Sequence, residues 1–213
     1  FRATELSFFE LLAPFAPTGI DIKAALTATE RANLHTYGYG VKAFGLSMVE
    51  AAITISQGQV PTEVLAHLIQ LTRDLLLAPV RLLDGVPEVL QELAKSHRLV
   101  LITKGDLVHQ TRKVTTSGLD HLFEHVEIVL EKDVATYAKV LRDISVQPEK
   151  VCMVGNSVKS DILPILELGG HAVHIPYHFL WELEQAEHPP LSPRFGELRN
   201  INELPAWIYQ LSL

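Results

Sequence analysis

At 213 residues the chain has room for one large domain or two small ones. Its formal net charge of -7 disfavours nucleic acids and anionic membranes as partners. No apolar run reaches the length of about 18 residues that a membrane-spanning helix needs. The single cysteine, Cys152, excludes an intramolecular disulfide and indicates a reducing, cytoplasmic compartment.

The first part of the chain carries almost only helical patterns, in which apolar residues recur at helical spacing. The expected helices cover residues 8–15, 21–38, 41–58 and 62–76. Asp21 and Thr62 stand where helix N-caps are expected. Because the connecting loops are short, these helices predict a small bundle, which we assign to a domain of residues 1–78.

From residue 79 onward, short apolar strands alternate with helices. The expected strands cover residues 99–102, 126–129, 151–154 and 171–175. The expected helices cover residues 86–95, 107–117, 133–144 and 161–168. This alternation predicts right-handed βαβ units and a parallel sheet with helices on both faces. We therefore expect an α/β protein whose Rossmann-like core comprises residues 79–213.

The carboxyl ends of the first three expected strands carry polar groups that suit a phosphorylated ligand. Thr103 and Lys104 follow the first strand, Lys132 follows the second, and Asn156 and Asp161 follow the third. Parallel sheets bind ligands at this edge. A hydroxyl and a backbone N–H bind phosphate oxygens, a lysine neutralises charge, and a carboxylate holds Mg²⁺. Each residue taken alone also has a purely structural explanation, as a helix cap, a solvated loop residue or a first-turn carboxylate.

The order of these groups resembles the haloacid dehalogenase-like hydrolase superfamily. Residues 99–106 look like the family's second motif, an apolar strand that ends in Thr or Ser, and Lys132 looks like its third-motif lysine. Residues 155–161, with the sequence Gly-Asn-Ser-Val-Lys-Ser-Asp, look like its fourth motif. The helical first third stands where many members carry a mobile cap domain.

The resemblance implies roles for three residues in phosphate binding. Thr103 would hydrogen-bond the transferring phosphoryl group, helped by the backbone N–H of Lys104. Lys132 would offset the negative charge of the nucleophile and the phosphate. All three would act at the same edge of the sheet.

The resemblance also implies a Mg²⁺ site. Asp161 would be a direct ligand of the metal. Asn156 stands where the family commonly has Asp, and its amide would reach the metal through water. Ser157 would either orient Asp161 or cap the following helix, and both hypotheses stay open.

The family's nucleophile belongs to an Asp-x-Asp motif, which has no counterpart in residues 1–10. Phe1 is not a methionine, and residues 1–5 resemble the stretch that follows such a motif. We therefore expect the nucleophilic aspartate, the general acid/base and the first core strand upstream of Phe1. Covalent phosphoryl transfer through an aspartyl phosphate needs that carboxylate.

The resemblance thus implies an enzyme, a Mg²⁺-dependent hydrolase of a small phosphorylated metabolite. Two alternatives stay open. A 2-haloacid dehalogenase-type hydrolase would need no Mg²⁺, and Asn156 fits it slightly, whereas the spacing from Asn156 to Asp161 matches the family's metal-binding form. A catalytically inactive relative would bind a ligand or a partner without turnover.

Three histidines near the fourth strand suggest a metal site, but strand geometry disfavours it. His171 and His174 are separated by an odd number of residues, so their side chains point to opposite faces of the sheet. We therefore do not expect a zinc site shared by His171, His174 and His178. For Asp106, which follows the expected phosphate-binding turn, we expect a helix cap rather than a place in the site.

Overall fold

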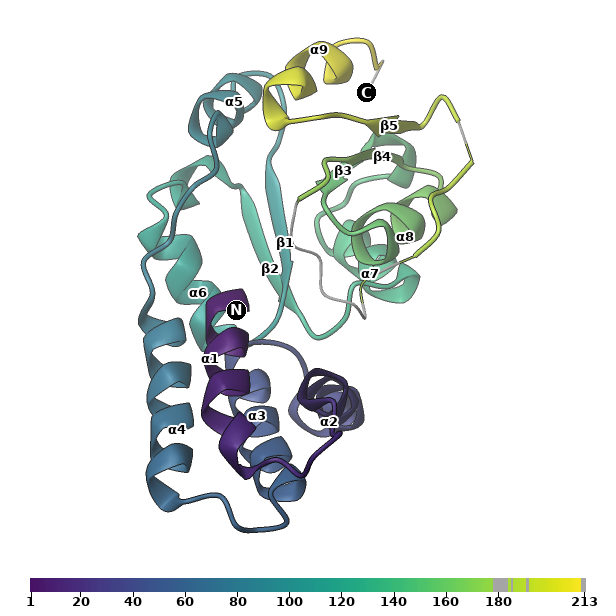
Figure 1. Cartoon of the computed structure of the whole chain (residues 1–213). Coiled ribbons are helices and arrows are strands. Elements are labelled where there is room, and N and C mark those ends of the chain that lie inside the picture. The colour runs from purple at the N-terminus through teal and green to yellow at the C-terminus, as the bar shows by residue number, and fades with distance from the viewer. Residues whose placement is uncertain (178–183, 185, 191, 212–213) are drawn as a thin grey trace. The chain divides into compact units, whose positions relative to one another are not determined.

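The computed structural model describes residues 1–177, 184, 186–190 and 192–211 (Figure 1). The chain forms two compact units, residues 1–80 with 105–113, and residues 81–104 with 114–213. Within the described ranges, every helix is too short or too polar to cross a lipid bilayer.

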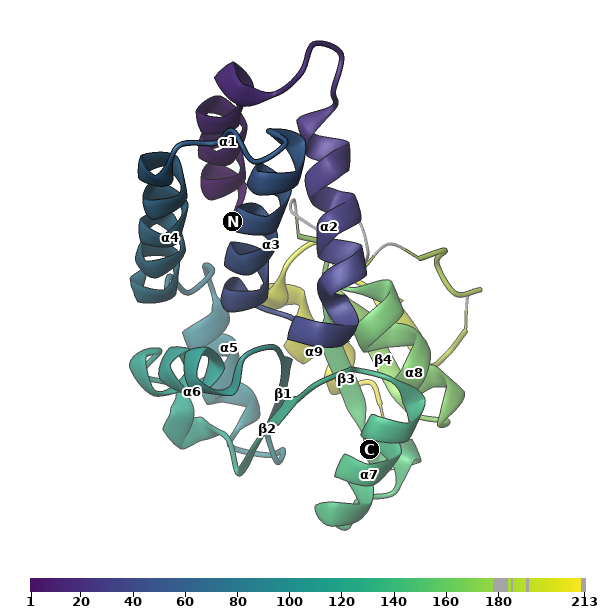
Figure 2. The same ribbon diagram turned by 90° about the horizontal axis from the view of Figure 1, so that it is seen from below.

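The first unit is a bundle of helices, as the sequence predicts. Its long helices are α1 (Arg2–Leu12), α2 (Ile22–Tyr37), α3 (Val41–Ile55) and α4 (Thr62–Leu77), with a 3₁₀ turn at Ala13–Phe15. Figure 2 shows α3 between α2 and α4, and α3 contacts both of them. The bundle core consists of fully buried side chains from all four helices, among them Phe8, Leu26, Met48 and Leu68.

Local side chains explain where these helices begin and how closely they pack. The carboxylate of Asp21 accepts the N–H of Ala24 at 2.9 Å and caps α2, as predicted. Thr62 is not a cap, because α4 begins at Thr62 and its N-cap residue is Pro61. At Gly45, a Cβ atom would lie 2.4 Å from Cγ2 of Thr72, so a glycine is needed where α3 meets α4.

The second unit has the α/β architecture expected from the sequence. Its strands are β1 (Val100–Lys104), β2 (His125–Val129), β3 (Cys152–Gly155), β4 (His171–His174) and β5 (Phe195–Glu197). Its helices are α5 (Val86–Leu93), α7 (Val134–Asp143), the π-helical turn η4 (Val158–Ile162), α8 (Leu163–Glu167) and α9 (Leu204–Ile208), and α6 (Leu107–Thr116) spans the boundary between the units. Short 3₁₀ turns cover Asp120–Leu122, Pro148–Lys150 and Ile201–Glu203.

All the strand pairs are parallel, as predicted, but the described residues form two sheets rather than one. One sheet has the order β1-β2, and the other has the order β3-β4-β5. Val100 pairs with His125 in the first sheet, and Cys152 pairs with His171 in the second. The edges of β1 and β3 that face away from these partners are paired with no strand among the described residues.

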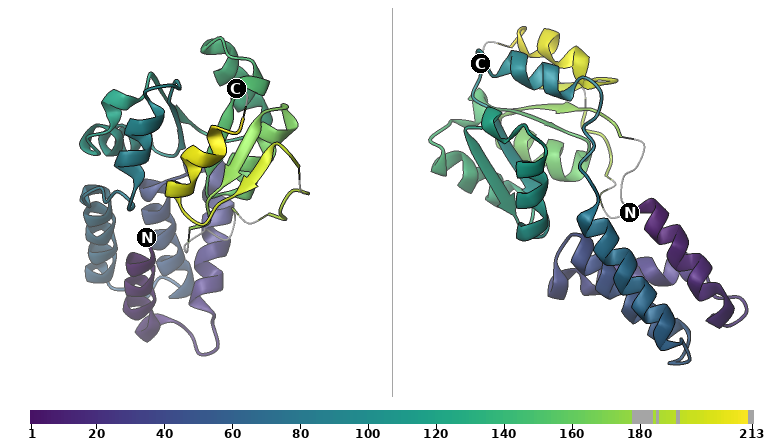
Figure 3. Two further views of the ribbon diagram at one scale, coloured as in Figure 1. Left: turned by 90° about the horizontal axis from the view of Figure 1, so that it is seen from above. Right: turned by 90° about the vertical axis from the view of Figure 1, so that its left-hand side faces the viewer.

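Helices cover both faces of the second sheet. Val173 of β4 packs in one cluster with residues of α5 and α9, which lie side by side (Figure 3). Its neighbour Ala172 packs in another cluster with residues of α7 and α8. Adjacent strand residues point to opposite faces, which explains why one strand contributes to two cores.

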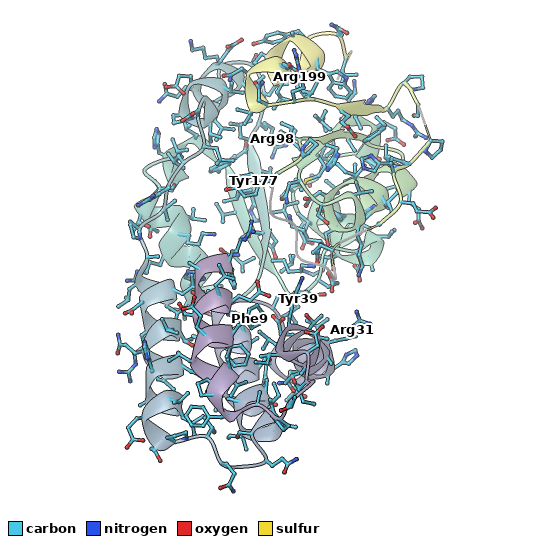
Figure 4. The ribbon with its side chains drawn as sticks, viewed as in Figure 1. Phe9, Arg31, Tyr39, Arg98, Tyr177 and Arg199 are labelled. Atoms are coloured by element: carbon cyan, nitrogen blue, oxygen red, sulfur yellow. The ribbon has the colours of Figure 1, made fainter. Side chains whose placement is uncertain are left out.

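Two side-chain contacts fix the ends of elements near these sheets. The guanidinium of Arg98, labelled in Figure 4, donates to both carboxylate oxygens of Glu124 at 2.8 and 2.6 Å, which joins the segments that precede β1 and β2. Asp106 accepts the N–H of His109 at 2.9 Å near the start of α6. Asp106 is therefore a helix cap, as expected, and it also pairs with Lys42 at 3.0 Å.

Candidate functional site

Asp161 lies in the π-helical turn η4, which directly follows β3. The sequence predicts a helix that starts at residue 161, whereas the structure starts the turn at Val158. Ser157 caps this turn, because its Oγ accepts the N–H of Ser160 at 3.1 Å. The backbone N–H of Ser157 also donates to Oδ2 of Asp161 at 3.0 Å. The Ser157 side chain is thus the cap of this turn, and the contact with Asp161 is made by the Ser157 backbone. π-Helical turns of this kind are frequent at functional sites.

Gly155 makes room for the carboxylate of Asp161. A Cβ atom at residue 155 would lie 2.2 Å from Oδ2 of Asp161, which is far inside van der Waals contact. The Asp161 side chain is only 6% exposed. The glycine that ends β3 is therefore a steric requirement for this buried carboxylate.

Lys132 is the ion-pair partner of Asp161. Its ammonium lies 2.7 Å from Oδ1 of Asp161, and the lysine side chain is 13% exposed. Lys132 sits in the loop after β2, directly before Asp133, whose carboxylate caps α7 by accepting the N–H of Thr136 at 2.8 Å. The fold thus brings together two residues that sequence analysis placed at the ends of different strands.

Lys104, the last residue of β1, forms a second cationic centre beside this pair. Its ammonium donates to Glu131 at 2.9 Å, to Glu184 at 2.7 Å and to Oγ of Ser160 at 3.2 Å. Glu131 also accepts the backbone N–H of Lys132 at 2.9 Å, so one carboxylate contacts both lysines. The charged side chain of Lys104, and not only its backbone, therefore belongs to this group.

Lys104, Ser157 and Ser160 form an anion-binding cradle around the carboxylate of Glu184. Oγ of Ser157 donates to Oε2 of Glu184 at 2.8 Å, and Oγ of Ser160 donates to the same oxygen. Burial alone would raise the pKa of Glu184, but hydrogen bonds from Lys104, Ser160 and Ser157 outweigh burial and hold that pKa below its usual range. The cradle therefore stabilises negative charge.

Tyr137 of α7 stabilises the π-helical turn η4 through a hydrogen bond. Its hydroxyl donates to the backbone carbonyl of Ser160 at 3.0 Å. Burial, together with the charges of Asp161 and Glu184, raises the pKa of this phenol well above its ordinary value. The hydroxyl therefore stays protonated and keeps donating to the π-helical turn.

Thr103 and Asn156 stand apart from these contacts. Thr103 pairs with Ile128 in the β1-β2 sheet, and among the described residues its hydroxyl makes no hydrogen bond to Lys132 or Asp161. Asn156 is exposed, and its backbone carbonyl lies 3.2 Å from Nε2 of His174. The structure thus brings Lys104, Lys132 and Asp161 into one network.

Sequence reasoning did not find three members of the network. Glu131 and Ser160 directly precede Lys132 and Asp161, so their neighbours in the sequence were a usable signal. Glu184 follows Ser157 by 27 residues and belongs to no strand end or periodic pattern. No local signal points to Glu184.

Comparison with known proteins gives a family match. Residues 12–169 match the family model described as haloacid dehalogenase-like hydrolase. The crystal structure of a haloacid dehalogenase-like family hydrolase from Xanthomonas campestris aligns with a TM-score of 0.87 at 35% identity, and the alignment covers 98% of this chain and 83% of that one.

Two curated relatives are described as glyceraldehyde 3-phosphate phosphatases. The one from Methanothermobacter thermautotrophicus is 32% identical over 85 residues, which is 38% of either chain. The one from Pyrococcus furiosus is 31% identical over 110 residues, which is 49% of this chain and 46% of that protein. The matched segments therefore span less than half the length of either phosphatase.

Proposed function

We propose a phosphate-ester substrate for this chain, which belongs to the haloacid dehalogenase-like hydrolase family. The reaction is the Mg²⁺-dependent hydrolysis of a small phosphorylated metabolite through an aspartyl phosphate. The attacking aspartate would belong to the family's Asp-x-Asp motif, which has no match in residues 1–10. The names of the two phosphatase relatives support a small phosphorylated substrate.

The observation that carries this proposal is the buried contact between Lys132 and Asp161 beside the anion-binding cradle. A carboxylate suited to a metal and donors suited to an anion meet where β1, β2 and β3 end. A phosphoryl group needs both a cation and hydrogen-bond donors. A carboxylate buried at 2.7 Å from a lysine is also costly to keep without such a role.

The residues present fit Mg²⁺. Asp161 offers carboxylate oxygens and Asn156 offers an amide oxygen, and hard oxygen ligands completed by water are what Mg²⁺ prefers. Asp161 would be the direct ligand, and Asn156 would act through water. When bound, Mg²⁺ supplies positive charge that neutralises the phosphoryl oxygens.

The lysines and hydroxyls would hold the substrate anion. Lys104, Ser157 and Ser160 already donate to the carboxylate of Glu184, and a phosphoryl group would compete with that carboxylate for the same donors. Lys132 would screen the negative charge beside Asp161, and Thr103 would donate its hydroxyl. Residues 1–78 would form the cap that excludes water during the reaction.

The test is hydrolysis of a chromogenic phosphate ester by the full-length natural protein. Lys132→Met and Asp161→Asn each remove one charge, and each should lower kcat by about 10²-fold or more. Lys139→Met and Asp143→Asn are matched controls, because that pair lies on the surface at 3.1 Å with side chains 65% and 57% exposed. The control variants should keep the activity of the unaltered protein.

The metal and the substrate class are tested in the same assay. EDTA should abolish turnover, and added Mg²⁺ should restore it. Turnover of a 2-haloacid that persists in EDTA would instead identify a dehalogenase. Phosphate binding without turnover in the full-length protein would identify an inactive relative, and either result overturns the proposal.

A further inference from the structure

We propose that His174, His188 and Glu197 form a binding site for a zinc-type transition metal ion. One ligand atom of each residue lies within 4.8 Å of the others. His174 ends β4, Glu197 ends the neighbouring strand β5, and His188 comes from the segment of residues 186–190. His171 is not part of this group, as strand alternation predicts, and His178 lies outside the described residues.

The two distances from Glu197 to the histidines are close to those of a tetrahedral metal centre. Oε2 of Glu197 lies 3.3 Å from Nδ1 of His174 and 3.1 Å from Nδ1 of His188. Ligands bound to Zn²⁺ at about 2.0–2.1 Å in a tetrahedron are separated by about 3.3 Å. A hydrogen bond from a charged imidazolium to a carboxylate is shorter, at about 2.7–2.9 Å. The spacing therefore favours a shared metal ion over a pair of ion-pair hydrogen bonds.

The hydrogen bonding of His174 is an independent sign of a bound cation. Its Nε2 lies 3.2 Å from the backbone carbonyl oxygen of Asn156, which can only accept a hydrogen bond. Nε2 therefore carries the hydrogen, and in the neutral ring Nδ1 presents a lone pair to the carboxylate of Glu197. Two acceptors face each other there. A metal ion between them removes this conflict, and an imidazole whose other N–H donates to a backbone carbonyl is the usual arrangement of a metal ligand.

The types of ligand select the class of metal. Two imidazoles and one carboxylate suit Zn²⁺ and its transition-metal neighbours, whereas Mg²⁺ and Ca²⁺ prefer an all-oxygen set. His174 has a side chain only 8% exposed, while His188 and Glu197 are about half exposed, at 53% and 49%. The buried imidazole provides a rigid anchor, and the exposed pair lets an ion and a water ligand enter from solvent.

A metal ion at this position would act as a structural clamp. His188 lies in a segment outside the strands, and the ion would fasten it to the ends of β4 and β5. The ion would also hold the ring of His174 against the carbonyl of Asn156, which directly precedes Ser157. This role does not depend on the proposed phosphatase activity.

The experiment is a calorimetric titration of the chelator-treated full-length protein with Zn²⁺ in excess Mg²⁺, which occupies all-oxygen sites. We expect one Zn²⁺ per chain and a higher thermal midpoint when Zn²⁺ is bound. His188→Ala and Glu197→Gln should each weaken binding by about 10-fold or more, since even outer-shell changes cost that much. Co²⁺ in place of Zn²⁺ should give visible absorption bands that the same variants lose.

His67→Ala is the matched control, because His67 is an exposed histidine on α4 far along the sequence from the cluster. It should bind Zn²⁺ as the unaltered protein does. The His188 side chain is more than half exposed, so its removal should leave the fold intact, and circular dichroism checks this. Absence of stoichiometric Zn²⁺ binding, or unchanged affinity in folded His188→Ala, overturns the proposal.

Discussion

At the residue scale, the buried carboxylate of Asp161 depends on the lack of a side chain at Gly155. We expect Gly155→Ala to displace that carboxylate, because the new methyl group would lie 2.2 Å from Oδ2. Overpacking of this kind costs about 1–3 kcal/mol. Phosphatase activity should fall by more than about tenfold, as expected when an active-site group shifts by about 1 Å.

Gly58→Ala separates this effect from the general cost of replacing a glycine. Gly58 has a φ of +78° and nothing within 4 Å of its added Cβ, so only backbone strain results. That strain costs about 1–2 kcal/mol. Thermal unfolding should shift in both variants, but kcat should fall only in Gly155→Ala. Equal kcat values in Gly155→Ala and Gly58→Ala would show that activity does not depend on the close approach of the Asp161 carboxylate to Gly155.

The lowered pKa of Glu184 makes a stability contribution that depends on pH. Its pKa in the unfolded chain is near the ordinary value of 4.5, and hydrogen bonds in the fold, mainly from Lys104, hold it lower. A carboxylate with a lowered pKa stabilises the fold above its unfolded pKa, and this contribution is lost as the pH falls through the folded pKa. Urea unfolding of the full-length protein should therefore show Glu184→Gln to be less stable at about pH 7, with a smaller difference at about pH 3. If the difference in unfolding free energy between Glu184→Gln and the unaltered protein does not change with pH, the cradle does not favour a charged ligand.

Sequence analysis placed Lys132 and Asp161 because each follows an apolar strand, and strand ends are a local signal. It did not identify Glu131 and Glu184, the two acidic partners of Lys104. Glu131 had a local signal, its position directly before Lys132, but which residue it pairs with depends on long-range folding, and Glu184 had no local signal at all. The contacts of Lys104 reach residues that are 27, 56 and 80 positions away in the chain. The same limit applies to His188 and Glu197, since no spacing rule links them to His174.

At the element scale, two aspartate caps offer a matched comparison. Asp133 caps α7 beside Lys132, and Asp21 caps α2 in the helical bundle. Asp133→Ala and Asp21→Ala should each lower the free energy of unfolding by about 1 kcal/mol. Only Asp133→Ala should also reduce kcat, because it loosens the start of α7 next to Lys132. Chemical denaturation and the phosphatase assay measure the two effects. Equal kcat values in the two variants would show that the Asp133 cap does not contribute to the activity of the site.

Elements with strong periodic patterns were predictable, and short or irregular ones were not. Apolar spacing predicted α2 and α3, and the short apolar runs predicted the strands up to β4. β5 has only three residues and includes Gly196, so it shows no alternation. The turn η4 is π-helical and only five residues long, which is too short for a period to be recognised from its apolar residues.

At the scale of the whole molecule, the α/β class and the helical bundle followed from the alternation of patterns along the chain. The division into the sheets β1-β2 and β3-β4-β5 did not, because strand pairing is set by contacts between distant segments. Side-chain contacts at the ends of β1, β2 and β3 connect the two sheets at the candidate site, namely the hydrogen bond from Lys104 to Ser160 and the ion pair between Lys132 and Asp161. The chemistry that we propose therefore depends on groups from both sheets remaining together.

The most direct test is a crystal structure of the full-length natural protein with Mg²⁺ and inorganic phosphate. We expect the phosphate to accept hydrogen bonds from Lys132 and Thr103, with the Mg²⁺ ion bound to a carboxylate oxygen of Asp161. A phosphate and a Mg²⁺ ion bound elsewhere, with Lys132 and Asp161 still in direct contact, would contradict the account.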